Sequence, residues 1–229
     1  MSDPLGEATG AVTSKAPGNG PGGVLSRWVF ALKPQSWPKL LVPAALGQAL
    51  GVAHTERWSW PPLIVGVLFT VFGGAFIVLA NDWADQEVDR LKRDMFPAAG
   101  SPKTIPDGVL GERSVAKGAA VAAGFAASVA VLGALWLSVA SLAWLGLGGI
   151  AVFAAYSLPP LRLNYRGGGE FLEAFGVGVV LPLFNAVAQG GSPANWAAAM
   201  ALPGFSCLAL ASALASGLSD EESDRAGGK

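Results

Sequence analysis

Long apolar runs separated by short polar segments make up most of this chain. Residues 118–161 and 174–219 contain no Asp, Glu, Lys or Arg. A helix needs roughly 20 apolar residues to cross a bilayer, so each run is long enough for a pair of spans. The pattern predicts an all-α fold, a polytopic transmembrane helical bundle with six spans at 37–54, 61–80, 116–137, 141–157, 171–189 and 195–218.

The composition also indicates a membrane protein. Of the 229 residues, 52% are hydrophobic and 14% are charged, which lies outside the usual range of soluble globular proteins. Membrane lipid is the expected surrounding, and no nucleic-acid partner is expected. Residues 1–24 are rich in Gly, Pro, Ala and Ser and lack an apolar run, which predicts a disordered cytoplasmic tail before a transmembrane domain at 25–229.

Basic residues divide unevenly between the loops that six spans create. Of the 15 Lys and Arg residues, all but Arg57 precede or open the first span, or follow the second, fourth and sixth spans. Cytoplasmic loops of membrane proteins carry the excess of Lys and Arg. We therefore expect an inner-membrane protein of a bacterium, with a cytoplasmic amino terminus and with these loops on the cytoplasmic face.

Two clusters of carboxylates begin where apolar segments end. Asp82, Asp85 and Asp89 follow the second span at spacings of i, i+3 and i+7, and Asp220 and Asp224 follow the sixth at i and i+4. On a continuing helix each set shares one face. Both spans run in the same direction, so we expect both clusters on the cytoplasmic side.

The position of these clusters suggests a bound cation. Each lies at a helix carboxyl end, where the macrodipole is already negative and added carboxylates are unfavourable without compensation. Ligand sets made of oxygen atoms favour a hard ion such as Mg²⁺. The alternative is that each cluster is a solvated acidic helix end, as we expect for Glu87 and Glu222, which point away from the two faces.

The basic residues near the clusters fit an anionic substrate. Metal-binding carboxylates opposite Lys and Arg form a site for a polyanion such as a diphosphate. Lys103 and Arg162, beside proline-bearing segments, are the candidates we favour for this contact. Topology alone accounts for most single basic residues, including Arg113 and Lys117.

At these residues the chain resembles the UbiA family of intramembrane prenyltransferases. Residues 81–89 are similar to the first aspartate-rich motif of that family, and residues 220–229 are similar to its second. The resemblance covers roughly residues 27–229. It extends to three further segments: Lys33-Pro34, Ile105-Pro106-Asp107-Gly108 and Tyr156-Ser-Leu-Pro-Pro-Leu-Arg162.

The resemblance implies a Mg²⁺-dependent enzyme. A prenyl diphosphate ionises to an allylic cation, which a lipophilic and often aromatic acceptor attacks inside the bilayer. The implied catalytic and Mg²⁺-binding residues are Asp82, Asp85, Asp89, Asp220 and Asp224. The implied substrate-binding residues are Asn81, Lys33, Lys103, Tyr156, Arg162, Arg225 and Lys229. Family members commonly have nine spans, so six spans imply a domain truncated at its carboxyl end.

Several functions remain open from the sequence. Residues 163–170 resemble dihydroxynaphthoate prenyltransferases, which favours a quinone precursor such as dihydroxynaphthoate or hydroxybenzoate as the acceptor. A chlorophyll-type or other acceptor is the first alternative, and a non-catalytic fragment that binds metal and diphosphate is another. A cation transporter fits less well, because its acids should lie in the middle of the membrane rather than at one face.

Overall fold

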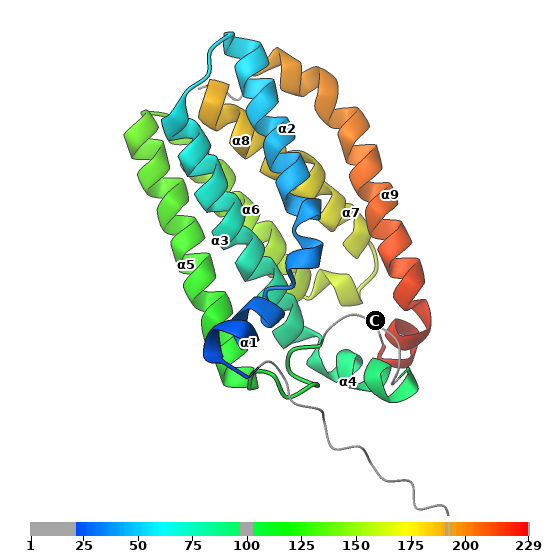
Figure 1. The fold of residues 1–229 in the computed structure, drawn as a ribbon. Coiled ribbons are helices and arrows are strands. Elements are labelled where there is room, and N and C mark those ends of the chain that lie inside the picture. The colour runs from blue at the N-terminus through cyan, green and yellow to red at the C-terminus, as the bar shows by residue number, and fades with distance from the viewer. Residues whose placement is uncertain (1–21, 97–102, 191, 193, 229) are drawn as a thin grey trace, which may run out of the picture.

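The chain folds into a helical bundle whose long helices run roughly side by side (Figure 1). The computed structural model describes residues 22–96, 103–190, 192 and 194–228, and these contain no strand. The helices are α1 (Val24–Ala31), η1 (Pro34–Ser36), α2 (Pro38–Thr55), α3 (Trp60–Ala84), α4 (Gln86–Met95), α5 (Glu112–Leu137), α6 (Ala140–Ser157), η2 (Leu163–Tyr165), α7 (Gly169–Phe175), the π-helical η3 (Gly176–Val180), α8 (Leu181–Gly190) and α9 (Trp196–Ala226).

The structure confirms the multi-pass membrane fold. In the described part of the chain, five helical segments are long and apolar enough to cross a bilayer: α3, α5, α6, the continuous segment α7–η3–α8, and Trp196–Leu218 of α9. The first predicted span, 37–54, does form helix α2. It is not among the five, because Lys39, Gln48 and His54 lower its apolar character.

Three local predictions need correction or extension. α1 occupies Val24–Ala31, where we predicted no helix; residues 1–21 of the predicted tail lie outside the described part of the chain. The helix that carries the first acidic cluster does not continue through it, because α3 ends at Ala84 and α4 begins at Gln86. α9 continues eight residues beyond the predicted end at 218, to Ala226, and includes the second cluster.

Small residues let the central helices approach closely. Phe69 of α3 and Phe184 of α8 stack with ring centroids 3.9 Å apart at the centre of the main apolar core. Gly146 of α6 lies against Ala130 of α5 so tightly that an added Cβ would be 2.4 Å from the alanine Cβ. Glycine and alanine at helix crossings are typical of membrane bundles, where packing rather than water drives association.

Polar side chains hold α2 against α8. The Gln48 side-chain amide donates to Oδ1 of Asn185 at 2.8 Å, inside the bundle. Gly47 approaches the Pro182 carbonyl so closely that an added Cβ would lie 2.1 Å from that oxygen. This contact accounts for the position of α2 in the bundle although its hydropathy is modest, and α2 leads back to Lys33 at the acidic cluster.

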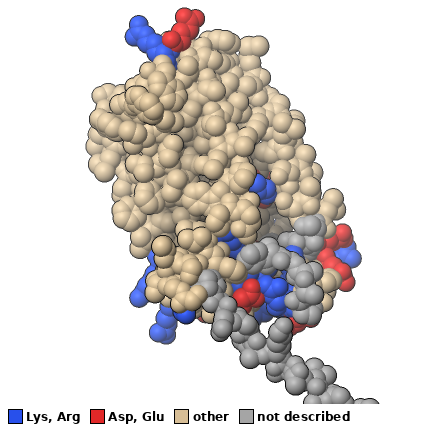
Figure 2. Space-filling view, viewed as in Figure 1, with Lys and Arg blue, Asp and Glu red and all other residues tan. Residues whose placement is uncertain are grey.

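Charged residues gather at one end of the molecule. Figure 2 shows a broad tan band with most Lys, Arg, Asp and Glu at its lower end and a small charged group at the upper end. The lower end, called the polar end below, contains α1, α4 and the carboxyl end of α9 (Figure 1). Along the sides of the bundle, large apolar residues such as Trp144, Leu135 and Met200 are exposed, as expected for surfaces that face lipid.

Candidate active site

The first acidic cluster is built on a break between two helices. The amide of Asp85 still donates to the Asn81 carbonyl at 2.9 Å, and the amide of Asp89 donates to the Asp85 carbonyl at 2.8 Å. The turn therefore redirects the chain without losing these backbone hydrogen bonds. Asp82, Asp85 and Asp89 are 4%, 6% and 8% exposed. The interpretation as a solvated acidic helix end is thus wrong for this cluster, while Glu87 is exposed as predicted.

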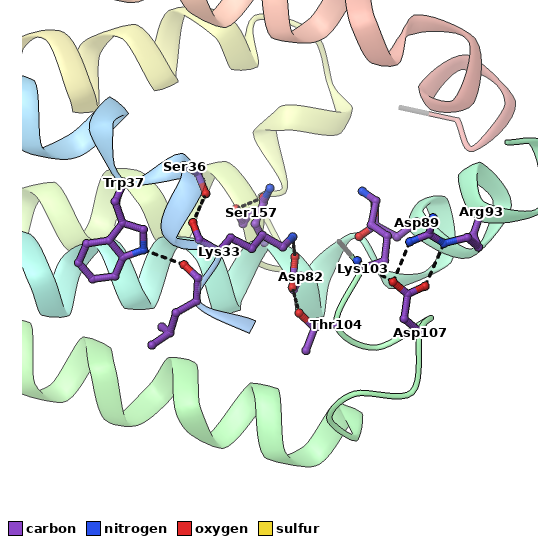
Figure 3. Close-up of polar contacts among 12 residues, drawn as sticks. Lys33, Ser36, Trp37, Asp82, Asp89, Arg93, Lys103, Thr104, Asp107 and Ser157 are labelled. Atoms are coloured by element: carbon purple, nitrogen blue, oxygen red, sulfur yellow. Dashed lines mark hydrogen bonds and ion pairs between the residues drawn. The ribbon is translucent and has the colours of Figure 1, made fainter. Parts of the chain in front are cut away.

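Lys33 and Thr104 enclose Asp82. The Lys33 ammonium pairs with Oδ1 of Asp82, and the buried Thr104 hydroxyl donates to Oδ2 (Figure 3). Lys33 has a positive φ of 47°, a left-handed conformation that is uncommon for a residue with a side chain. Two hydrogen bonds hold this turn, from the Ser36 hydroxyl to the Lys33 carbonyl and from the Trp37 indole to the Leu32 carbonyl, each 2.7 Å.

Lys103 pairs with Asp89 in a similar way. This ion pair is largely buried, each side chain being 11% exposed. Burial raises the pKa of Asp89 above its ordinary value, and the charge of Lys103 offsets only part of that rise. Asp107 fixes the segment after Lys103, because its carboxylate accepts the Lys103 amide at 3.0 Å and a bidentate pair from Arg93 at 2.9 and 2.7 Å.

The loop after α6 covers Asp85. The Tyr165 hydroxyl donates to Oδ1 of Asp85 at 2.9 Å. The Arg162 guanidinium lies over the Tyr165 ring, 3.9 Å from its centroid, and donates to the Ala84 carbonyl at 2.9 Å. Arg162 thus places positive charge at the carboxyl end of α3, where the helix dipole is negative. Burial, followed by the charge of Asp85, raises the pKa of Tyr165 above its ordinary value.

Asn81 and Tyr156 join this loop to the centre of the site. The Ser157 hydroxyl donates to the Asn81 side-chain oxygen at 2.9 Å. Tyr156, the neighbouring residue, is half-buried and lies within electrostatic range of four carboxylates, those of Glu173, Asp85, Glu170 and Asp224. One carboxylate from each acidic cluster, Asp85 and Asp224, is thus near Tyr156.

The second cluster lies beside the first. Asp220 and Asp224 are both in α9, as the i, i+4 spacing predicts, and α9 packs against α4. Gly227 is so close to Val88 that an added Cβ would be 2.6 Å from its side chain. Asp224 is half-buried, whereas Glu222 is exposed as predicted. The side chain of Asp220 lies outside the described part of the structure.

Of the predicted basic residues that follow the second cluster, Arg225 points away from the site. Arg225 pairs with Glu221 one helical turn away at 2.6 Å, and both side chains are mainly exposed. Lys229 lies outside the described residues. The structure thus brings Lys33, Lys103 and Arg162 to the first cluster and leaves Arg225 on the outer surface of α9. The substrate-binding roles of all of these residues stay predictions.

The chemistry of the site suits a hard divalent cation. Within the described ranges, no three Asp, Glu, His or Cys side chains are grouped as a metal-ligand set. The carboxylates of Asp82, Asp85 and Asp89 are nevertheless all buried around one helix break, and two of them already hold ammonium groups. Buried carboxylate oxygens that attract positive charge are the donors that Mg²⁺ prefers.

Several residues of the site were not predicted as site residues. Thr104, Ser157 and Tyr165 each contact the first cluster through a hydroxyl group. Their signal in the sequence was only their position: Thr104 precedes Ile105-Pro106, Ser157 follows Tyr156, and Tyr165 lies within residues 163–170. A second polar group of α2, α7 and α9 was also missed, in which Lys39 contacts Glu173 at 3.0 Å and Ser216 at 3.2 Å.

Comparisons with known proteins show the family of the chain. Residues 40–229 match the model of the UbiA prenyltransferase family. The 2-carboxy-1,4-naphthoquinone phytyltransferase of Synechocystis sp. is 26% identical over 75% of this chain and 50% of its own length. Chloroplastic chlorophyll synthase of Arabidopsis thaliana is 26% identical over 62% of this chain and 37% of its own length. The chain thus spans half of the first relative and less of the second.

A solved structure has the same fold. A UbiA homolog from Archaeoglobus fulgidus, bound to DMAPP and Mg²⁺, aligns with a TM-score of 0.66 and 21% sequence identity. The alignment covers 88% of this chain and 66% of that one.

Proposed function

Because the chain belongs to the UbiA prenyltransferase family, we propose that it transfers a prenyl group from a prenyl diphosphate to a lipophilic aromatic acceptor. The observation that supports this most is the buried cluster of Asp82, Asp85 and Asp89 at the polar end of a membrane bundle, next to α9 and its second acidic cluster. Buried charges of this density are costly unless they bind cations, and a diphosphate with its counter-ions supplies both charge signs.

The residues divide into two roles in this proposal. When bound by Asp82, Asp85, Asp89, Asp220 and Asp224, Mg²⁺ supplies positive charge that neutralises the diphosphate. Lys33 and Lys103, which pair with Asp82 and Asp89 in this structure, are then available to donate to diphosphate oxygens. Arg162 and Tyr165 hold the helix break in place, and Arg162 is a further candidate for diphosphate contact.

The surroundings of Tyr156 suit the allylic cation that forms during the reaction. The bond between the allylic carbon and the diphosphate oxygen breaks, and its electron pair leaves with the diphosphate. The aromatic ring of Tyr156 stabilises the allylic cation, together with Glu170 and Glu173, the two nearby carboxylates that this proposal does not assign to Mg²⁺. An electron-rich carbon of the acceptor then bonds to the cation, and the acceptor ring loses the proton of that carbon.

A bicyclic quinone precursor is the acceptor that we favour. The similarity to a naphthoquinone phytyltransferase supports it, together with the resemblance of residues 163–170 noted above. A chlorophyll-type acceptor is the second candidate, supported by the similarity to chlorophyll synthase. Parallel assays with a dihydroxynaphthoate and with a chlorophyllide as acceptor distinguish the two.

The same proposal includes an orientation. The polar end carries nearly all the described basic residues, so we propose that it faces the cytoplasm by the positive-inside rule and that the membrane is the inner membrane of a bacterium. Prenyl diphosphates are water-soluble at one end and apolar at the other. A site at the cytoplasmic interface lets the diphosphate enter from water while the prenyl chain stays among the helices.

The test is prenyl transfer by single alanine variants of the complete protein. Asp82→Ala, Asp85→Ala, Asp89→Ala, Asp220→Ala and Asp224→Ala should each abolish or severely reduce transfer in the presence of Mg²⁺. Glu87→Ala and Glu222→Ala are matched controls, because both side chains are exposed beside the clusters, and they should be mild. Equal losses in all seven variants would contradict a role for specific carboxylates.

Binding measurements separate an enzyme from a non-catalytic fragment. The chain should bind a prenyl diphosphate such as DMAPP only with Mg²⁺ present. Binding without transfer would support the fragment alternative, and Mg²⁺ binding without diphosphate binding would contradict both. Lys103→Ala and Arg162→Ala should weaken diphosphate binding by about ten- to a hundredfold if they contact it.

A further inference from the structure

An open groove on the outer surface of the bundle lies away from the acidic clusters. It has a volume of about 540 Å³ and is formed by α1, α3 and α5. The volume is within the usual range of small-molecule sites. Figure 1 shows α3 and α5 side by side, with α1 across their lower parts at the polar end. The helices α3 and α5 are both spanning segments, so this surface faces lipid.

The groove changes from polar to apolar along its length. On α5 it is lined by Ser114 and Lys117 in the first turns and then by Val121 and Phe125 deeper in the membrane. These positions are spaced by three or four residues and share one helix face. From Lys117 to Phe125 the helix rises about 12 Å. Such a gradient matches an amphiphile with its head at the interface and its chain in the membrane.

Aromatic residues close the two ends of the groove. At the polar end the Trp28 ring lies on Gly118, where an added Cβ would be 2.7 Å from the ring. At the deep end Phe72 stacks on Phe125, with ring centroids 5.0 Å apart. Val121 and Phe125 are 58% and 53% exposed. The groove is therefore apolar, is bounded at each end by aromatic rings, and is open along the side that faces the bilayer.

Lys117 supplies a positive charge at the mouth of the groove. It is exposed, and among the described residues it makes no ion pair. Basic side chains lie along the lower left edge of Figure 2, at the end where α1 and α5 meet in Figure 1. Lysine at the membrane surface attracts anionic lipid headgroups. Lys117 has no part in the proposed chemistry, because it lies on the outer face of α5.

From these observations we infer that the groove binds one anionic phospholipid, with its phosphate at Lys117 and Ser114 and one acyl chain along Val121 and Phe125. The charge of Lys117 selects an anionic headgroup, and the apolar side chains of Val121 and Phe125 contact the upper part of an acyl chain that lies along α5. The site is separate from the acidic clusters, so the inference does not depend on the proposed activity.

The test is retention of lipid by the purified protein. The protein is exchanged into nanodiscs or detergent with phosphatidylglycerol or with phosphatidylcholine of the same acyl chains, and bound lipid is counted by native mass spectrometry. We expect one retained phosphatidylglycerol and a preference over phosphatidylcholine of about fivefold, since one lysine near anionic lipid contributes about that factor. Lys117→Gln should remove the preference.

Steric variants test the apolar part. Ala75→Leu and Val121→Trp each place bulk in the groove and should reduce retention of both lipids; Val121 is exposed, so its variant spares the packed core. Arg57→Gln, at the opposite end of the bundle, and Ala120→Leu, exposed on α5 outside the groove, are matched controls that should keep the lipid.

Three results would overturn the inference. Equal retention of the two lipids by the parent protein would show that Lys117 does not select an anionic headgroup. Undiminished phosphatidylglycerol in both Ala75→Leu and Val121→Trp would show that the lipid lies elsewhere. Release of the lipid by excess DMAPP would place the groove on the substrate path instead.

Discussion

The Tyr165 hydroxyl donates a hydrogen bond of 2.9 Å to Oδ1 of Asp85. This contact joins the loop after α6 to the break between α3 and α4, across 80 residues of sequence. Because the Arg162 guanidinium lies over the Tyr165 ring and donates to the Ala84 carbonyl, the loop contacts both the Asp85 side chain and the backbone of the break. The geometry of the first acidic cluster thus depends on a segment far away in the chain.

The first prediction concerns the titration of Tyr165. The chain has two tyrosines, so a Tyr156→Phe variant reports on Tyr165 alone. Burial and the Asp85 charge raise the pKa of Tyr165, so its phenolate should form only well above pH 10. Asp85→Asn should lower this pKa. The measurement is the ultraviolet absorbance of phenolate during a pH titration in EDTA, and an ordinary value near 10 in the folded variant would contradict the contact.

The same shift predicts a loss of stability at alkaline pH. Unfolded Tyr165 releases its proton near pH 10, while folded Tyr165 keeps it. Above that pH the folded state binds more protons than the unfolded state, so stability falls as pH rises. Thermal unfolding measured from pH 9 to 11 should show a smaller decrease in Tyr165→Phe than in the parent protein.

A second prediction concerns the ion pairs of Lys33 and Lys103. Lys33→Met or Lys103→Met leaves Asp82 or Asp89 as an uncompensated buried charge, which should cost about 3–5 kcal/mol of stability in metal-free buffer. Arg225→Met is the control, because the side chains of Arg225 and Glu221 are 80% and 57% exposed, and it should cost less than about 1 kcal/mol. Thermal unfolding in EDTA measures the difference.

Adding Mg²⁺ extends this experiment. If the carboxylates bind the ion, Mg²⁺ replaces the missing ammonium charge and the deficit of Lys33→Met should shrink. An unchanged deficit at millimolar Mg²⁺ would argue against metal binding by Asp82, independently of any activity assay.

A third prediction tests the proximity of the two acidic clusters. In a Cys207→Ala background, the pair Val88→Cys and Gly227→Cys should form a disulfide under mild oxidation, because the two positions are in contact between α4 and α9 and a disulfide requires such proximity. The control pair is Glu87→Cys with Gly227→Cys, since Glu87 is exposed. Equal cross-linking of both pairs would show that α9 does not hold this position.

A fourth prediction concerns the orientation in the membrane. Single cysteines that replace Glu87 and Glu222 should both react with a membrane-impermeant thiol reagent from the cytoplasmic side, and a cysteine at Arg57 should react from the opposite side. Labelling of Glu87→Cys and Glu222→Cys from opposite faces would exclude a shared diphosphate site.

A fifth prediction concerns the contact between Gln48 of α2 and Asn185 of α8. An added Cβ at Gly66 would lie 2.2 Å from both the Asn185 and Gln48 side chains, whereas at Gly73 of the same helix it would meet nothing within 4 Å. Gly66→Ala should therefore cost about 1–3 kcal/mol through overpacking, and Gly73→Ala should be neutral or slightly stabilising. Denaturation in detergent measures both. A neutral Gly66→Ala would show that the Gln48–Asn185 contact yields easily.

The amino-acid pattern alone was enough to place most of the bundle. Five of the six predicted spans satisfy the length and hydropathy of a membrane helix, because crossing a bilayer imposes a local requirement that any stretch of about 20 residues shows directly. The helical spacing of Asp220 and Asp224 was also predictable, because α9 continues without interruption through both residues.

Other features depend on contacts between distant segments. The break at Asp85 was not predictable, because no Gly or Pro marks that position and the hydrogen bonds that Tyr165 and Arg162 make there come from a distant segment. The pairing of Lys33 with Asp82 joins residues 49 positions apart, and no periodicity in the chain records such a pair. Local hydropathy determines which residues enter the membrane, whereas the partners of buried charges are selected only when the helices pack and exclude water.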